Sequence, residues 1–193
     1  FDSQLLLIRT YLNKTTDKTK SDMYVKITNI LSQIIHPDMV PENMVRLSDA
    51  IYEISSANKF YSKLFAGMYV DLVQEYPKLT GTLDAKMQRF TDLSMFDAIA
   101  INTDTTSYEQ SCKNNKNNDM LKAETTFLGH ILTITYKFDA ITNVLIELAD
   151  RIDASKMDAA AKNNNHEVIE YVYILFKLLK VTHTDEASAS AKP

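Results

Sequence analysis

Apolar residues recur every three or four positions along most of the chain. The clearest stripe consists of Phe138, Ile141, Leu145, Leu148 and Ile152. Residues at this spacing lie on one face of an α-helix, so each stripe predicts an amphipathic helix whose apolar face is buried. Similar stripes begin at Leu5, Met23, Met44, Tyr61, Leu79, Phe127 and Val168. The pattern therefore predicts an all-α protein.

Turn signals separate these helices and group them into pairs. Pro37 ends the second stripe, because the residue before a proline is disfavoured in a helix. Pro41 opens the third stripe from the first turn of its helix. The resulting antiparallel pairs cover residues 2–35, 40–76, 79–136 and 138–181.

The first two pairs are close to the roughly 40–47-residue period of HEAT repeats. In such repeats each helix pair buries one face against its neighbours in a stack. We therefore predict an all-α, HEAT-like solenoid of about four antiparallel helix pairs over residues 1–181. An irregular helical bundle is the alternative arrangement of the same helices.

Three polar stretches interrupt this pattern. Residues 102–119 lack apolar periodicity, which predicts a polar insertion that forms a loop. Residues 153–165 are expected to form a second polar connector that ends with Asn165 as the N-cap of the last helix. Residues 182–193 are small and polar, and are expected to form a frayed tail.

The helix expected over residues 59–72 (KFYSKLFAGMYVDL) combines aromatic with small side chains. Ala66 and Gly67 are small enough to permit the close approach of another helix. Four residues are expected to be buried in the core and so show which helix faces pack inward: Leu64, Met68, Ile141 and Leu145. Residues 59–72 resemble the second-repeat signature of the middle domain of eukaryotic translation initiation factor 4 gamma.

Three further segments resemble the same family, in the same order along the chain. They are residues 8–16 (IRTYLNKTT), 121–132 (LKAETTFLGHIL) and 167–172 (EVIEYV), with Lys122 where the family has a glycine. The resemblance implies a HEAT-like fold and a non-enzymatic scaffold of translation initiation in the cytoplasm. Such a scaffold helps to recruit mRNA by binding a DEAD-box RNA helicase, RNA or other initiation factors.

The resemblance also implies a partner-binding edge at the first turn between helices. Its residues in this chain are Leu12, Asn13, Lys14, Thr15, Lys18 and Lys20. Thr15 replaces an apolar residue of the family, and Lys20 replaces an aromatic one. Because buried apolar anchors carry most of the binding energy of an interface, a helicase contact here should be weaker or more salt-dependent, or the partner should differ, as with RNA. The alternative function is a helical-repeat interaction module of RNA processing or decay that does not bind a helicase.

Lysines in several segments are candidates for contact with RNA phosphates. The net charge of the chain is −4, so an RNA-binding surface would have to be a local basic patch. The residues expected to bind RNA are Lys14, Lys18, Lys20, Lys59 and Lys63. A further candidate group is Lys113, Lys116 and Lys122. Ordinary solvated lysines are the alternative, and most Tyr and Phe residues are expected to pack in the core rather than stack on bases.

Motifs for enzymatic chemistry are missing from the sequence. Cys112 is the single cysteine, so it forms no internal disulfide or zinc site and favours a reducing compartment. None of the four histidines has the spacing of a catalytic or metal-binding motif. No segment has the length and apolar character of a transmembrane helix. We therefore expect no enzymatic activity, no cofactor, no metal and no membrane partner.

Overall fold

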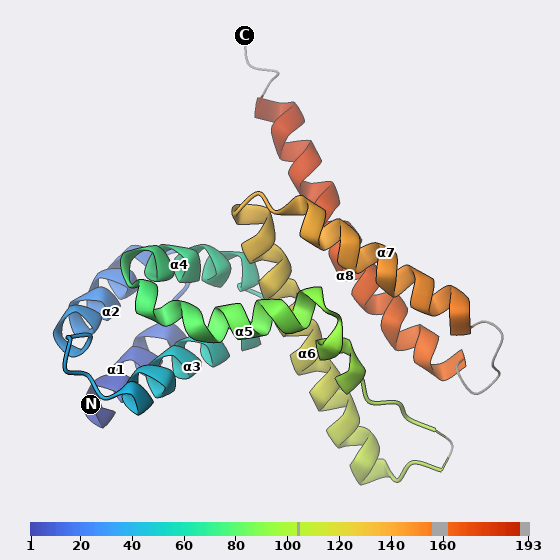
Figure 1. Ribbon diagram of the computed structural model, residues 1–193, viewed down its shortest axis with the longest axis horizontal. Helices are drawn as coiled ribbons and strands as arrows, with labels where there is room; N and C mark the ends of the chain where they lie inside the picture. Colours follow the sequence, from blue (N-terminus) through green and yellow to red (C-terminus); the bar gives the residue numbers. More distant parts are fainter. Residues whose placement is uncertain (104, 156–161, 190–193) are drawn as a thin grey trace. The chain divides into compact units, whose positions relative to one another are not determined.

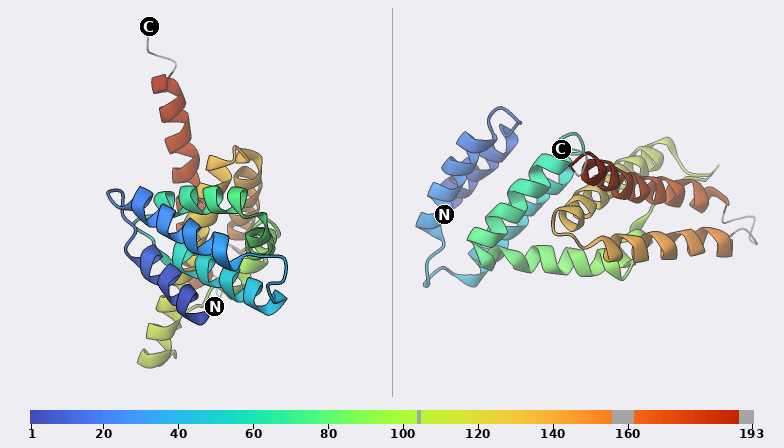
Figure 2. Two further views of the ribbon diagram at one scale, coloured as in Figure 1. Left: turned by 90° about the vertical axis from the view of Figure 1, so that its left-hand side faces the viewer. Right: turned by 90° about the horizontal axis from the view of Figure 1, so that it is seen from above.

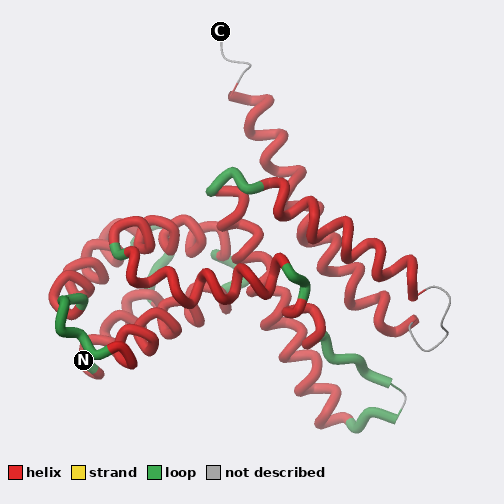
Figure 3. Tube along the Cα trace, in the orientation of Figure 1, coloured by secondary structure: helices red, strands yellow, loops and turns green. Residues whose placement is uncertain are grey.

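The computed structural model describes the backbone of residues 1–103, 105–155 and 162–189, and the side chains of residues 1–103, 105–152 and 166–180. Over these residues the chain forms helices and no strand (Figures 1 and 3). The elements are α1 (Asp2–Asn13), α2 (Lys20–Ile34), α3 (Pro41–Ala57), α4 (Ser62–Glu75), η1 (Pro77–Leu79), α5 (Thr80–Thr91), η2 (Ser94–Ala98), α6 (Tyr108–Ile134), α7 (Phe138–Ser155) and α8 (Lys162–Ala189). The all-α class is confirmed, whereas the HEAT-like solenoid stays a prediction.

The chain divides into two compact units, unit 1 over Phe1–Gln88 and unit 2 over Arg89–Pro193. The expected third helix pair, residues 79–136, is divided between these units. A single HEAT-like domain over residues 1–181 therefore stays a prediction, and each unit is described by itself.

Unit 1 contains two antiparallel helix pairs, α1 with α2 and α3 with α4, and α1 also packs against α3 (Figure 2). Leu5, Ile8 and Leu12 form the buried face of α1, as the stripe predicted. Polar contacts join α2 to the end of α4, since the Tyr24 hydroxyl donates a hydrogen bond to Glu75 (2.9 Å). These contacts fix the two pairs against each other within the unit.

The helix faces agree only in part with the predicted core. Met68 and Ile141 are buried, but Leu64 and Leu145 are half-buried. In α4 the buried face is centred on Phe65, Met68 and Tyr69 rather than on the stripe through Leu64. The choice of face is therefore corrected for Leu64, because the larger Phe65 and Tyr69 occupy the core instead. It is also corrected for Leu145, because the buried face of α7 passes through Ile141, Val144 and Leu148.

Unit 2 contains α6, α7 and α8, and α8 packs along both other helices. The helices α7 and α8 lie side by side and run in opposite directions (Figures 1 and 2). Gly129 of α6 packs directly against side chains of α8, because a Cβ atom there would lie 2.4 Å from Leu178 Cδ1. Only a glycine lets the two helices approach this closely without a shift.

The prediction of a loop over residues 102–119 is wrong from Tyr108 onward, where α6 begins. The Ser107 hydroxyl caps this helix by accepting a hydrogen bond from the Gln110 amide. Asn114 and Asn118, four residues apart, are buried on one face of α6. The search for apolar periodicity did not detect the start of α6, because the buried face of this segment carries amides instead of aliphatic side chains.

The last helix differs from the sequence prediction at both ends. It begins at Lys162, so Asn165 lies inside α8 and is not its N-cap. It continues to Ala189, beyond the expected end of the helix near residue 181. The fraying of residues 182–189 stays a prediction, and residues 190–193 lie outside the described part. Of the expected connector 153–165, residues 156–161 also lie outside it.

Candidate functional site

The turn between α1 and α2 holds most of the residues expected to bind a partner. Leu12 is fully buried and Thr15 is only 3% exposed. The Thr15 hydroxyl donates a hydrogen bond to the Tyr11 carbonyl (2.9 Å), which satisfies its polar group inside the unit. These two side chains therefore belong to the interior of the turn, whereas Asn13, Lys14 and Lys18 are exposed.

Hydrogen bonds within this turn hold its backbone in place. The Thr19 hydroxyl donates to the Lys14 carbonyl (2.8 Å) and accepts from the Thr16 amide (2.9 Å). The Thr19 hydroxyl thus provides hydrogen-bond partners for two backbone groups of the turn, in place of other backbone groups. The exposed Lys14 and Lys18 are carried by an ordered segment.

Lys20, the first residue of α2, lies over α4. Its Nζ is 3.9 Å from Asp71 Oδ2 and 3.9 Å from the position that a Cβ atom would take on Gly67. Lys63, Gly67 and Asp71 are four residues apart on α4, so they share one face of that helix. Lys20 Nζ therefore lies over the face of α4 that also carries Lys63.

The connector between α3 and α4 presents an aromatic ring beside two lysines. Phe60 is 95% exposed, and its neighbours Lys59 and Lys63 are exposed as well. The Asn58 side chain accepts a hydrogen bond from the Tyr61 amide (3.1 Å), which fixes the turn around Phe60. Phe60 is therefore an exception to the expectation that most aromatic residues pack in the core. It precedes the apolar stripe that begins at Tyr61 and is not part of it.

We call the five lysines expected to bind RNA the lysine surface: Lys14, Lys18, Lys20, Lys59 and Lys63. Their two segments, the α1–α2 turn and the α3–α4 connector, lie at the same end of the two helix pairs of unit 1 (Figure 2). The Lys20–Asp71 pair is long and exposed, with side-chain exposures of 38% and 54%, so it contributes little stability. Lys20 therefore remains able to bind a phosphate.

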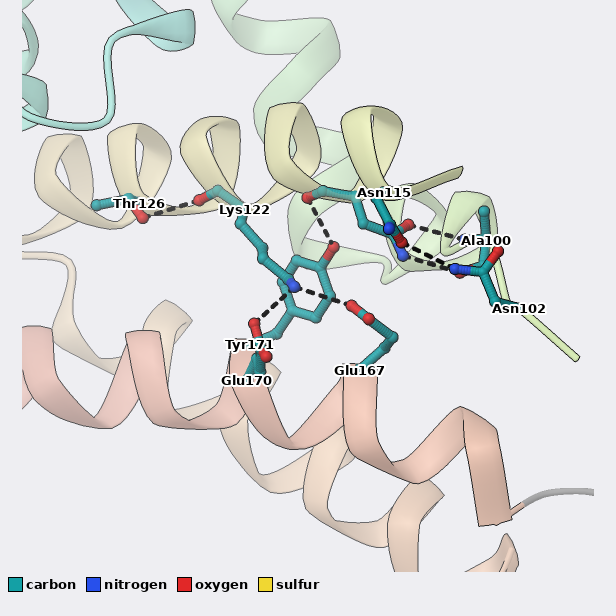
Figure 4. Close-up of polar contacts among 9 residues, drawn as sticks. Ala100, Asn102, Asn115, Lys122, Thr126, Glu167, Glu170 and Tyr171 are labelled. Carbon is teal, nitrogen blue, oxygen red and sulfur yellow. Dashed lines mark hydrogen bonds and ion pairs between the residues drawn. The ribbon is translucent and has the colours of Figure 1, made fainter. Parts of the chain in front are cut away.

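A different lysine, Lys122, is buried in unit 2 and paired with two glutamates there (Figure 4). Its Nζ lies 2.6 Å from Glu170 Oε2 and 2.9 Å from Glu167 Oε2, and its side chain is 9% exposed. Burial alone would lower the pKa of Lys122, but hydrogen bonds and charges from Glu170 and Glu167 outweigh it and raise this pKa. Burial, followed by the two glutamates, also raises the pKa of the Tyr171 hydroxyl.

The expected RNA contact of Lys122 is therefore wrong, because its ammonium group holds α6 to α8. Lys113 of the same group pairs with Glu109 (2.7 Å) on the surface. Lys116 is exposed, but the other two lysines of this group are paired with glutamates, so the group forms no basic patch. The lysines of unit 1 remain as the candidate surface.

Few features of the described residues suggest a metal site, a ligand pocket or a membrane-spanning helix. Among them, no cluster of three or more His, Cys, Asp and Glu residues could hold a metal ion. A shallow recess of about 230 Å³ in unit 1 is lined by residues that include His36, Glu75 and Lys78. None of the described helices is both long and apolar enough to cross a bilayer. The absence of enzymatic activity and cofactors and the cytoplasmic location stay predictions.

Comparisons with family models, with curated proteins and with solved structures found no match for this chain. What is shown is an all-helical protein with eight α-helices in its described part. The resemblance to the initiation-factor middle domain rests on the four sequence segments alone.

Proposed function

We propose that this chain is a non-enzymatic scaffold of translation initiation that helps to recruit mRNA, and that it contacts RNA phosphates through the lysine surface of unit 1. The observation that carries the proposal is the position of Lys20 over Gly67 on α4. It places a lysine of the first turn on the helix face of Lys63. Two lysine groups far apart in sequence thereby form one local basic surface on an acidic protein.

The burial of Leu12 and Thr15 favours RNA over a helicase as the first partner. A helicase contact of the kind implied by the resemblance would use these residues, but both lie inside the turn. The side chains that remain at this edge are polar or basic, and such groups contribute charge complementarity more than anchoring energy. A DEAD-box helicase and other initiation factors are further partners of this proposal, on the resemblance alone.

Salt dependence is the quantitative signature of phosphate contacts. Each contact with a single strand contributes a slope of about −0.7 to log K against log salt concentration. Five lysines in contact would give a slope of about −3.5 and a loss of affinity on the order of 100-fold between 50 and 200 mM salt. A much flatter slope would contradict binding through this surface.

The test is fluorescence anisotropy of a labelled single-stranded RNA with the purified chain at low salt. The triple variant Lys14→Glu, Lys18→Glu, Lys20→Glu should bind far more weakly and with a slope flatter by about 2, while the melting temperature stays nearly the same. The control reverses three exposed lysines elsewhere, with the same change in net charge: Lys78→Glu, Lys116→Glu and Lys137→Glu. Equal loss in both triple variants would show an effect of net charge rather than of this surface.

Binding to a purified DEAD-box helicase of translation initiation is measured in parallel. If the parent chain binds neither helicase nor RNA at micromolar concentration and low salt, the scaffold proposal is wrong. The module of RNA processing or decay would then be the better explanation of the fold.

A further inference from the structure

We propose that Phe60 is a stacking platform for an unpaired base, so that the lysine surface selects single-stranded over double-stranded RNA. This inference rests on the proposed function, because it names the substrate class of the same surface. Phe60 is 95% exposed, and its ring carries no polar atom that water could satisfy. Burying a phenylalanine ring is ordinarily favourable, so a ligand that covers the Phe60 ring would gain binding free energy from it.

The turn around Phe60 is ordered, which keeps the ring outside. The Asn58 side chain accepts from the Tyr61 amide, and the Tyr61 carbonyl accepts from the Phe65 amide (2.9 Å) in the first turn of α4. The next side chains along the chain, Ser62 and Phe65, are buried and anchor the start of α4 in the core. Phe60 is thus presented on a fixed support, which reduces the ordering cost of binding.

The charges beside Phe60 match the other half of a nucleotide. Lys59 precedes the ring, and Lys63 follows it on the first turn of α4, where Lys20 lies on the same helix face. Aromatic rings that stack on bases next to lysines that contact the backbone are the usual combination in proteins that bind single strands. Every base has an aromatic face, so this arrangement binds without a strong sequence preference.

Tyr108, another strongly exposed aromatic residue, lacks this setting. Tyr108 is 87% exposed, but Glu109 follows it and pairs with Lys113. Tyr108 therefore provides a matched control, because it has similar exposure and an acidic neighbour. In a duplex the base faces are stacked on one another and closed to a side chain. Phe60 can therefore contribute only to the binding of an unpaired strand.

The first experiment replaces the ring in the full chain and measures RNA affinity by anisotropy. Phe60→Ala should weaken single-stranded RNA binding by roughly 5- to 150-fold. The slope against salt should not change, because no phosphate contact is lost. Phe60→Tyr should bind like the parent, whereas Phe60→Leu should not, since leucine keeps apolar area but has no aromatic face. Rescue by leucine would overturn the inference and indicate an apolar anchor for a protein.

The second experiment uses the absence of tryptophan from the chain. Phe60→Trp introduces a single indole, whose fluorescence should be quenched when single-stranded RNA binds. The same RNA should leave the fluorescence of Tyr108→Trp unchanged, and a duplex of equal length should quench neither variant. Quenching by the duplex equal to that by the single strand would overturn the inference.

The failure of this inference can be told from the failure of the proposed function. If the parent binds RNA with a steep salt dependence and Phe60→Ala binds equally well, stacking is wrong and the lysine surface stands. If the parent does not bind RNA at all, stacking and the RNA contact of the lysine surface are both wrong, and only binding to a helicase would still support the scaffold.

Discussion

Lys20 in unit 1 and Lys122 in unit 2 each lie near acidic side chains, but their surroundings differ. Lys20 is 3.9 Å from one carboxylate, and the two side chains of that pair are 38% and 54% exposed. Lys122 lies within 2.9 Å of two carboxylates, and its side chain is almost fully buried. In the first setting the lysine can exchange its partner for a ligand at little cost. In the second setting the lysine is part of the fold, because an unpaired charge in the interior is costly.

The largest expected effect separates these two lysines by stability. Lys122→Met should lower the free energy of unfolding by about 3 kcal/mol, because it leaves Glu167 without its partner in a half-buried position. Lys20→Met should change it by less than about 0.5 kcal/mol. Urea denaturation followed by far-UV circular dichroism measures both. Similar values for the two variants would break the comparison.

A pair of helical glycines sharpens the same contrast between a packed and an open site. Gly129→Ala should destabilise unit 2 by about 2 kcal/mol, because the new Cβ would lie 2.4 Å from Leu178 Cδ1. Gly67→Ala should instead stabilise unit 1 by about 0.5 kcal/mol, since the nearest atom is Lys20 Nζ at 3.9 Å and alanine favours the helix. Melting temperatures of the two variants should shift in opposite directions. A rise for Gly129→Ala would show that α6 and α8 are less closely packed.

The smallest effect concerns the polar face of α6. Asn118 donates to the Ala100 carbonyl (2.8 Å) and accepts from the Ala100 amide (2.9 Å). Asn118→Ala should cost about 1 kcal/mol, because it leaves both backbone groups of Ala100 without these partners. Asn115→Ala should cost less, since Asn115 bonds Asn102 on the surface.

Hydrogen exchange tests the helical structure of this part of α6 without a substitution. Amides of residues 114–118 should be protected, because they lie inside α6. Rapid exchange over this range would restore the loop that the sequence predicted.

The prediction was most accurate where a single apolar face decided the structure. Leu5, Ile8 and Leu12 were expected on one helix face, and they are its buried residues. It failed where polar side chains make the buried contacts, as Asn114 and Asn118 do in α6. Amides at helical spacing give no hydropathy signal, although a helix with buried amides is stable when each amide finds its hydrogen-bond partners.

The sequence by itself determined the all-α class and most of the helices, because amphipathic periodicity is a local property of each segment. The candidate site depended on tertiary structure. Whether a lysine can bind a ligand or is held in a buried ion pair depends on the residues that packing brings beside it. Lys20 over α4 and Lys122 against α8 are the two cases. The exposure of Phe60 was decided in the same way, since the face of α4 that packs in the core sets which neighbouring side chains remain in water.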